Sequence, residues 1–452
     1  MCQAEMDYRF GWRWLLPAVE GSIRIYGFSD EEKQFWYKQL PDVEWYSEVT
    51  PPKFLLANND RYATQIEPSF ADIQAAELVC VIGDRKQTKY WRTILNKTFP
   101  LIREYSLLPS DNPRVIIPLS SIRYAVTALS LHRPGRWIAR LAISLARVLA
   151  FFGNFWLLRG RVLLIATRAT GFIPSSALQV GLPSRFGQQS IDYALYLGTS
   201  DDNRKTVVLP LGDLPPSIIL KVAETPRARA SLMNEASALS ALSQLPLASY
   251  VPKLEDLISS DAMLTLCQEY RSRRPVSQRK LNAAVINFLG QLMALNHQST
   301  PLSVYLQVLP DDSEECMADD VISACRALRG KLQNQAELNV EILLHRTHGD
   351  FAPWNCIWTD QNLFVFDWEE SEADGLALQD AFYYVIAPAL LVQRKASAAE
   401  TLNAVFCFAN RVVEASGQKL DIRIYLALWL LTHVGRAELY DELCVLLARK
   451  WQ

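Results

Sequence analysis

The chain has 452 residues, of which 50% are hydrophobic and 21% are charged. This composition excludes a disordered, collagen-like or coiled-coil protein, and the length predicts about two to four domains. The formal net charge is −2, because 46 Lys and Arg residues face 48 Asp and Glu residues. Non-specific nucleic-acid binding requires a strongly basic surface, so we expect no nucleic-acid partner.

The eight cysteines are scattered along the chain, and no two of them form a CxxC pair. This spacing argues against a disulfide framework or a zinc site and favours free thiols in a reducing compartment. The first seven residues include two acids and no apolar stretch, which argues against a secretory signal. We therefore expect a cytoplasmic protein.

The first region, residues 1–125, alternates apolar strands with helices. Strands are expected at 22–27, 78–84 and 114–118, with a helix from 86 to about 105 between the last two. This alternation predicts a Rossmann-like α/β domain with a parallel sheet. The turns after the first two strands lack the glycine-rich sequence that lets a backbone approach a phosphate. We therefore expect a degenerate domain that has lost or never had a cofactor and serves for docking.

Residues 126–185 are predicted to form an apolar helical linker, and its segment 136–158 is nearly free of polar residues. At 100° per residue, four of its polar side chains fall within about 40° of one another. They are Arg136, Arg140, Arg147 and Asn154. A membrane span would place Arg147 near the bilayer centre at a cost of roughly 2.5–3.5 kcal/mol, which disfavours a span. The helix either packs between domains or lies peripherally on the inner face of the membrane.

The candidate chemistry lies in the segment HGDFAPWN, residues 348–355. Two short apolar runs follow it, separated by a polar turn of three residues, and this pattern predicts a hairpin. Because a hairpin doubles back, Asn355 and Asp367 are expected side by side at its open end. Asp350 is one short loop away.

This arrangement suits phosphoryl transfer. Asp350 would accept the proton of a hydroxyl, while the amide oxygen of Asn355 and the carboxylate of Asp367 would hold Mg²⁺ against the phosphates. Protein kinases have the same order of residues. Their loop reads His-Arg-Asp where this chain has His-Gly-Asp, and their Asp-Phe-Gly stands where this chain has Asp-Trp-Glu.

HGDFAPWN followed by VFDWE resembles the aminoglycoside phosphotransferase and choline kinase branch of the protein-kinase-like fold. The resemblance implies a bilobal α+β domain with a small lobe over 186–272 and a mostly helical large lobe over 273–452. It implies ATP and Mg²⁺ as cofactors, and a sugar, an aminoglycoside-like molecule or an amino alcohol as the hydroxyl acceptor. It also implies that backbone groups of Gln268, Glu269 and Tyr270 hold the adenine.

A kinase-like site also needs a lysine on a strand and a glutamate on the following helix. The apolar run 217–223 predicts a strand that carries Lys221. Thr225 and Pro226 then predict the start of a helix with Glu235 in its middle. Considered alone, each charge fits a solvated surface. Together with the downstream motif, they predict a Lys221–Glu235 ion pair that holds the phosphates.

Three functions stay open. The first is an ATP- and Mg-dependent kinase that phosphorylates a hydroxyl of a small molecule or sugar. The second is a catalytically inactive kinase-like module that only binds, although binding alone does not require the whole set of polar residues. The third is a bifunctional enzyme whose N-terminal domain transfers a methyl or glycosyl group, for example in surface polysaccharide biosynthesis.

Overall fold

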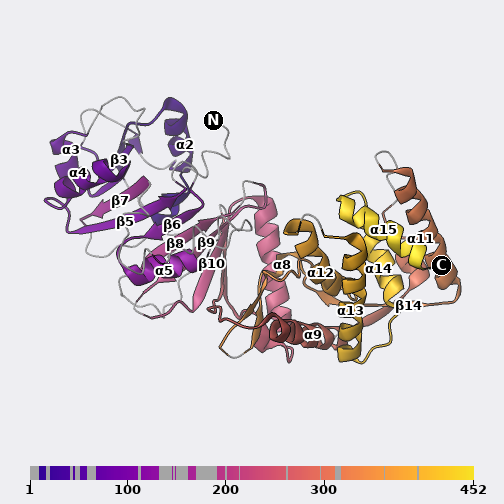
Figure 1. The fold of residues 1–452 in the computed structure, drawn as a ribbon. Helices are drawn as coiled ribbons and strands as arrows, with labels where there is room; N and C mark the ends of the chain where they lie inside the picture. The colour runs from indigo at the N-terminus through magenta and orange to yellow at the C-terminus, as the bar shows by residue number, and fades with distance from the viewer. Residues whose placement is uncertain are drawn as a thin grey trace. The chain divides into compact units, whose positions relative to one another are not determined.

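The structure, a computed structural model, contains two compact units that are described separately (Figure 1). The first unit consists of Met1–Leu232 and Leu254–Tyr270, and the second of Met233–Lys253 and Arg271–Gln452. The structure describes residues 10–16, 21–40, 44–45, 51–58, 68–109, 113–131, 145, 148, 161–168, 191–198, 201–212, 214–260, 263–295, 297–310, 317–360, 362–393 and 396–451.

The described part of the first unit is built on a sheet of 12 strands. In spatial order they are β11 (Leu254–Ser259), β12 (Leu264–Glu269), β10 (Ile218–Ala223), β9 (Lys205–Leu211), β8 (Asp192–Leu197), β6 (Val115–Pro118), β5 (Leu101–Leu108), β7 (Arg161–Thr167), β4 (Leu78–Gly83), β3 (Phe54–Asn58), β1 (Ser22–Tyr26) and β2 (Glu44–Trp45). Every residue of β3, β4 and β10 is buried. Such continuous burial is typical of strands that are covered on both faces.

Strand direction changes within this sheet. Strands β2, β1, β3 and β4 run parallel, as the alternation in residues 1–125 predicts. The strand predicted at 114–118 is present as β6, but it pairs antiparallel with β5 and β8, so its predicted parallel pairing is wrong. The helix predicted from 86 to about 105 is too long. Helix α4 (Arg85–Leu95) ends before Pro100, which cannot continue a helix, and β5 follows.

Strand β7 lies within the residues predicted to form a helical linker. It pairs antiparallel with β4 on one side and β5 on the other, so a helix there is wrong. A short apolar run fits a buried strand as well as a helix, and only the strands beside it decide between them. Because four parallel strands continue into antiparallel ones, the Rossmann-like assignment as a whole is not confirmed.

Helices cover both faces of the parallel strands. Helix α2 (Asp30–Gln39) and the short helix η1 (Gly11–Leu15) pack aromatic residues against one face. Helices α3 (Phe70–Ala75) and α4 pack against the other. Helix α2 begins after Ser29, which caps it. The Ser29 hydroxyl accepts the N–H of Glu32, and the Glu32 carboxylate accepts the N–H of Ser29.

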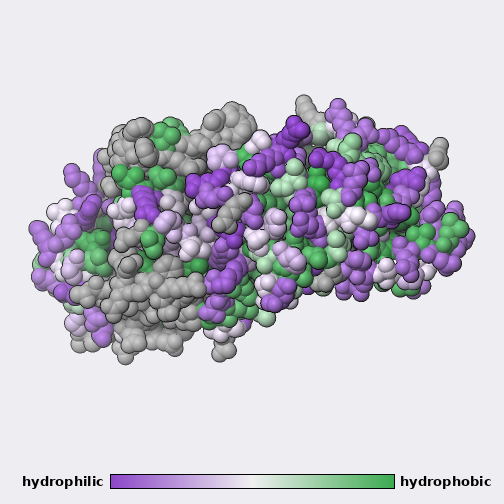
Figure 2. Space-filling model, turned by 90° about the horizontal axis from the view of Figure 1, so that it is seen from below, coloured by the Kyte–Doolittle hydropathy of each residue, from purple (hydrophilic) through white to green (hydrophobic). Residues whose placement is uncertain are grey.

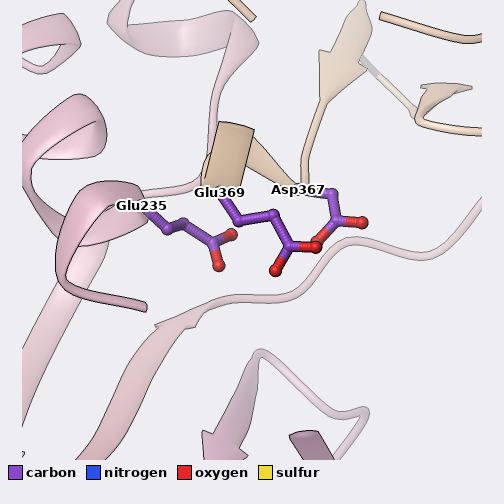
Figure 3. A group of neighbouring side chains, drawn as sticks. All are labelled: Glu235, Asp367 and Glu369. Atoms are coloured by element: carbon purple, nitrogen blue, oxygen red, sulfur yellow. The ribbon is translucent and has the colours of Figure 1, made fainter. Parts of the chain in front are cut away.

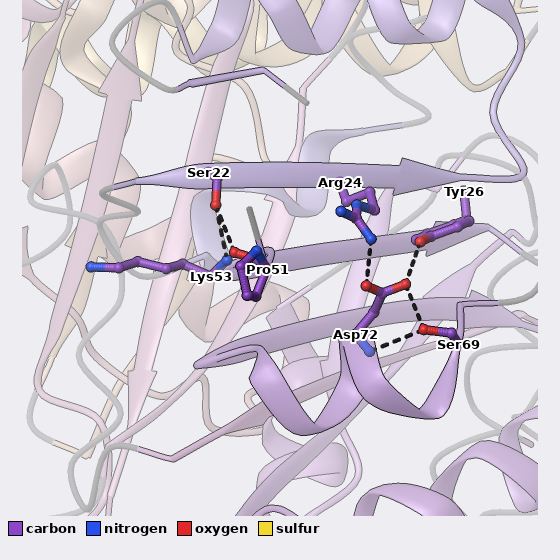
Figure 4. A network of polar contacts seen from close by, with 7 residues as sticks. All are labelled: Ser22, Arg24, Tyr26, Pro51, Lys53, Ser69 and Asp72. Carbon is purple, nitrogen blue, oxygen red and sulfur yellow. Dashed lines mark hydrogen bonds and ion pairs between the residues drawn. The ribbon is translucent and has the colours of Figure 1, made fainter. Parts of the chain in front are cut away.

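An ion pair ties strand β1 to helix α3 (Figure 4). Arg24 of β1 pairs with Asp72 of α3, and the Tyr26 hydroxyl donates to the same carboxylate at 2.8 Å. The Ser69 hydroxyl also donates to Asp72 at 2.8 Å and accepts the Asp72 N–H, which caps the helix. Both charged side chains are largely buried, so removing one charge would leave the other buried without the ion pair. The network therefore fixes α3 on the sheet.

A buried carboxylate joins the N-terminal strands to the strands that follow. Asp192, the first residue of β8, accepts hydrogen bonds from the hydroxyls of Tyr105 and Ser120, each at 2.6 Å. Arg103 of β5 lies 3.3 Å from Asp192 and donates to the carbonyl of Ile191. Strand β8 also pairs with β6. The residues predicted to form the N-terminal domain and the small lobe therefore share one sheet.

The second unit is mainly helical, with two small sheets among its described residues. One sheet has the order β13 (Gln298–Pro301), β14 (Glu341–Thr347) and β17 (Glu372–Leu376), and the other is the hairpin of β15 (Cys356–Trp358) and β16 (Leu363–Val365). The helices are α9 (Gln278–Ala294), α10 (Leu302–Leu306), α11 (Asp319–Glu337), α12 (Gln379–Leu391), α13 (Ala398–Ser416), α14 (Ile422–Leu431) and α15 (Glu438–Lys450). Helix α14 is buried along its length and contacts α11, α12, α13 and α15.

Two further α-helices belong to the described chain. Helix α5 (Ile122–Leu131) packs on β6 and β8 of the first unit. Helix α8 (Pro226–Leu242) follows β10, and its residues are shared between the two units. It begins at Pro226, as predicted, and the hydroxyl of Thr225 accepts the N–H of Ala228.

Acid should destabilise the second unit through His345 of β14. Burial lowers the pKa of this imidazole to about 4, whereas an unfolded histidine has a pKa near 6.5. Between these values the unfolded chain binds a proton that the folded chain does not, so stability falls as the pH falls. The expected loss is about 3 kcal/mol, measured by urea unfolding at several pH values. His345→Gln should flatten this dependence.

Hydropathy describes the visible face of the molecule and its helices. Figure 2 shows hydrophilic side chains over much of the coloured surface, interrupted by small hydrophobic patches. Within the described ranges, no helix has both the length and the apolar character that crossing a bilayer requires. The segment 136–158, predicted to pack between domains or on a membrane, lies outside the described residues apart from positions 145 and 148.

Candidate active site

The predicted hairpin is present in the second unit. Strands β15 and β16 pair antiparallel around residues 359–362, with Cys356 opposite Val365. At the open end, the N–H of Phe366 donates to the carbonyl of Asn355 at 3.1 Å. Asn355 therefore lies on one arm of the hairpin and Asp367 follows the other, next to this backbone pair.

The loop that carries Asp350 is held by a buried carboxylate. Asp380, near the start of α12, accepts the backbone N–H of His348 at 2.7 Å and that of Gly349 at 3.1 Å. Burial raises the pKa of Asp380 to about 7, against the opposing effect of these two donors. The His348 ring braces the loop from another side, because its Nε2 lies 3.0 Å from the carbonyl oxygen of Phe366.

Gly349 is required by the loop geometry. Its φ of +84° lies in the left-handed region, where side chains with a Cβ are strained. An added Cβ would also collide with the carbonyl oxygen of Glu370. The glycine between His348 and Asp350 therefore lets the loop pass closely over the residues that follow the hairpin.

The carboxylate of Asp350 accepts a side-chain hydrogen bond from the hairpin. The amide nitrogen of Asn355 donates to it at 3.0 Å. Burial raises the pKa of Asp350, and the charges of Asp367 and Glu370 raise it further, while Tyr383 and Asn355 oppose this effect. The carboxylate is thus held in place but half-buried among other acids.

Three carboxylates converge beside the hairpin (Figure 3). Each of Glu235, Asp367 and Glu369 offers an oxygen, and these atoms all lie within 4.8 Å of one another. Figure 3 shows Glu235 extending from its helix toward Glu369, whose carboxylate lies beside that of Asp367. The Asn234 amide donates to the carbonyls of Glu369 and Ser371 at 2.8 and 2.9 Å, which ties α8 to this segment. Oxygen ligands of this kind are those that Mg²⁺ prefers.

Glu235 and Lys221 are not surface charges. The Glu235 side chain is fully buried, which excludes a solvated helix face. Lys221 is only 7% exposed and lies on β10 between β9 and β12, so it does not occupy an edge strand. Lys221 belongs to the first unit and Glu235 to the second, and their ion pair stays a prediction.

The predicted adenine-binding segment is the end of strand β12. Gln268 is buried, and the register of β10 and β12 places it on the same face as Lys221. Glu269 is the last residue of the strand, and the N–H of Tyr270 donates to the carbonyl of Ser217 at 2.8 Å. The backbone at this point continues the sheet, and a role in adenine binding stays a prediction.

The part of the chain that contains these residues matches a known family. Residues 199–402 match the model of the phosphotransferase enzyme family. The match extends from just before β9 into α13 and includes Lys221, Glu235, Asp350, Asn355 and Asp367. The resemblance inferred from HGDFAPWN and VFDWE is therefore confirmed. We call residues 199–402 the phosphotransferase segment, and its described residues contain both helices and strands.

Solved structures of small-molecule kinases are similar to part of the chain. They include an aminoglycoside phosphotransferase from Streptomyces rimosus in complex with ADP and streptomycin, with 18% identity and a TM-score of 0.34 over 53% of this chain and 92% of that one. An amicoumacin kinase in complex with AMP-PNP and Ca²⁺ has 14% identity and a TM-score of 0.36, over 57% of this chain and 87% of that one. Aminoglycoside 2′-phosphotransferase-IIIa in complex with GDP has 14% identity and a TM-score of 0.35, over 61% of this chain and 98% of that one. No curated protein sequence matches the chain.

Two features of the phosphotransferase segment escape analysis of the sequence. Tyr383 looks like one more aromatic residue, and nothing in its spacing indicates that it influences the pKa of Asp350. Asn234, which ties α8 to the backbone of Glu369 and Ser371, likewise shows no signal in the sequence, although it directly precedes Glu235. Gly349 does carry a signal, because a glycine stands where protein kinases have an arginine.

Proposed function

We propose that this protein is a small-molecule kinase, which transfers the γ-phosphoryl group of ATP to a hydroxyl with the help of Mg²⁺. One observation supports this most strongly. Asp350 is held by Asn355 within a segment of the phosphotransferase family, and Asp367 stands beside two further carboxylates. A base next to a site for a divalent cation is the combination that phosphoryl transfer requires.

In this mechanism Asp350 takes the proton of the acceptor hydroxyl as the hydroxyl oxygen bonds to the γ-phosphorus. The bond between that phosphorus and the oxygen bridging to ADP breaks, and ADP leaves. Asn355 and Asp367 would hold Mg²⁺, which neutralises charge on the phosphate oxygens when bound. Lys221, paired with Glu235, would hold the phosphates, and backbone groups of the segment from Gln268 to Tyr270 would hold the adenine.

Asp367→Ala should abolish turnover and Mg-dependent ATP binding together, because it removes a charged metal ligand. Calorimetric titration with ATP, in Mg²⁺ and in EDTA, measures the binding. Asp374→Ala is the matched control, because it removes an exposed acid from β17 of the same unit. If Asp367→Ala binds ATP with unchanged Mg²⁺ dependence, Asp367 is not a metal ligand.

The acceptor is best found by screening. Purified protein with Mg-ATP is incubated with sugars, aminoglycosides and amino alcohols, and ADP formation is compared with that in the absence of acceptor. We expect one of these classes to raise ADP formation well above the rate with water alone. Retained Mg-ATP binding without turnover of any acceptor would favour the catalytically inactive binding module instead.

A further inference from the structure

The side-chain amide of Asn234 bridges two carbonyl groups in the turn that follows Asp367. Its nitrogen donates to the carbonyl of Glu369 at 2.8 Å and to the carbonyl of Ser371 at 2.9 Å. An amide nitrogen carries two N–H groups, so these two bonds use both of them. Carbonyl oxygens can only accept, which fixes the end of the amide that faces the turn. All four residues belong to the second unit.

Asp367 adopts a backbone conformation that needs such support. Its φ of +75° and ψ of +53° lie in the left-handed region, which few residues other than glycine occupy. A residue stays in that region only where its surroundings determine the backbone from several sides. At the start of the turn, the indole of the buried Trp368 donates to the carbonyl of Val365 at 3.0 Å. The two bonds from Asn234 hold the other end.

Ser371 continues this bridge to the loop that carries Asp350. The Ser371 hydroxyl donates to the carbonyl of Thr347 at 2.7 Å, and Thr347 directly precedes His348 of that loop. Ser371 is buried, so water does not compete for these contacts. The residue therefore receives a bond from α8 at its carbonyl and gives one to the loop from its hydroxyl. A movement of α8 would shift the turn between these contacts.

We propose that Asn234 is a positioning residue for Asp367, because its amide holds the turn after Asp367 against helix α8. This inference rests on the proposed kinase function, in which Asp367 binds Mg²⁺. Helix α8 also contributes Glu235, whose carboxylate lies close to those of Asp367 and Glu369 (Figure 3). Like charges at this separation repel one another, so the turn needs bonds that do not depend on the ion. The two carbonyls that Asn234 contacts supply them.

Calorimetric titration with ATP, in Mg²⁺ and in EDTA, tests this role without an acceptor and without turnover. In the parent, Mg²⁺ should tighten ATP binding. Asn234→Ala should reduce that gain by about tenfold, because the loss of a residue that orients a metal ligand typically weakens metal affinity by about 10–100-fold. Its ATP affinity in EDTA should stay near that of the parent, whereas general damage to the fold would weaken binding in both solutions.

Unfolding of the variant does not obscure this result. Unfolded molecules lower the number of binding sites in the titration and leave the dissociation constant of the folded ones unchanged. If Asn234→Ala does not fold at all, Asn234→Ser, which keeps one donor on a shorter side chain, is titrated with the same expectation.

Asn282→Ala is the matched control. Asn282 is also half-buried on a helix of the second unit, and its side-chain oxygen accepts hydrogen bonds from the Gln278 amide at 2.7 Å and the Tyr384 hydroxyl at 3.0 Å. Its substitution breaks two side-chain bonds away from the turn and should leave both ATP affinities near those of the parent. An unchanged Mg²⁺ gain in Asn234→Ala, or an equal loss in Asn282→Ala, would overturn the positioning role and leave the kinase function standing. A parent protein whose ATP binding does not depend on Mg²⁺ would refute both.

Discussion

Asp350→Asn should lower turnover by about 10²–10⁴-fold, the contribution that a general base typically makes. A hydroxyl does not ionise at neutral pH, so a carboxylate must take its proton as the new bond to phosphorus forms. Asparagine has nearly the same shape and can still accept the hydrogen bond from Asn355, but it cannot take up a proton. ATP affinity should stay close to that of the parent, because the proposed contacts to phosphate and metal come from other residues. The measurements are kcat with the acceptor found by screening and the dissociation constant of Mg-ATP.

Asp360→Asn is a suitable control for this experiment. Asp360 is exposed at the tip of the hairpin, where it pairs with Arg274, and it lies outside the proposed machinery. Its substitution makes the same chemical change and should leave kcat near that of the parent. An Asp350→Asn protein that turns over like the parent would remove the proposed mechanism and leave a binding module in its place.

Gly349→Ala should damage both turnover and stability. The φ of +84° strains any residue with a Cβ, and the added methyl group would collide with the carbonyl oxygen of Glu370. The loop must then shift, and Asp350 shifts with it. We expect kcat to fall by about 10²-fold, as misplacement of a catalytic group by about 1 Å can do. Steady-state kinetics and thermal unfolding measure the two effects.

Gly417→Ala distinguishes the effect of backbone strain from the effect of the collision with Glu370. Gly417 ends α13 with a φ of +71°, yet nothing lies within 4 Å of the Cβ it would acquire. It therefore measures the backbone strain alone, expected at about 1–3 kcal/mol, without a collision near the active site. If both variants lose the same stability and neither loses turnover, close packing against Glu370 does not position Asp350.

The hairpin at 356–365 and the strand with Lys221 are predictable because their signals are local. Alternating runs of apolar and polar residues specify the first, and an apolar strand followed by Thr225 and Pro226 specifies the second. The motif HGDFAPWN likewise locates Asp350 and Asn355, because their spacing along one short segment fixes their chemistry. In each case, a few neighbouring residues hold the information.

The other features of the fold and the site depend on contacts between residues that are far apart in the sequence. Strand β7 looks like a helical apolar run until β4 and β5 flank it, and β6 looks like a parallel strand until β5 pairs with it in the opposite direction. Asn234 donates to the carbonyl of Glu369 across 135 residues of sequence, and no pattern connects them. Such contacts form when distant segments pack together, and a single sequence does not reveal which segments do so.

The shared sheet affects how loss-of-function variants should be interpreted. Asp192 and Arg103 have no place in the proposed chemistry, yet they hold β8 beside the N-terminal strands. A chain that begins after residue 125 would lack β6 and present the bare backbone of β8, a template for pairing with other chains. Poor solubility would then mimic lost catalysis. In a random mutagenesis screen, inactivating changes in residues 101–120 would accordingly report on folding and aggregation and would not identify a second active centre.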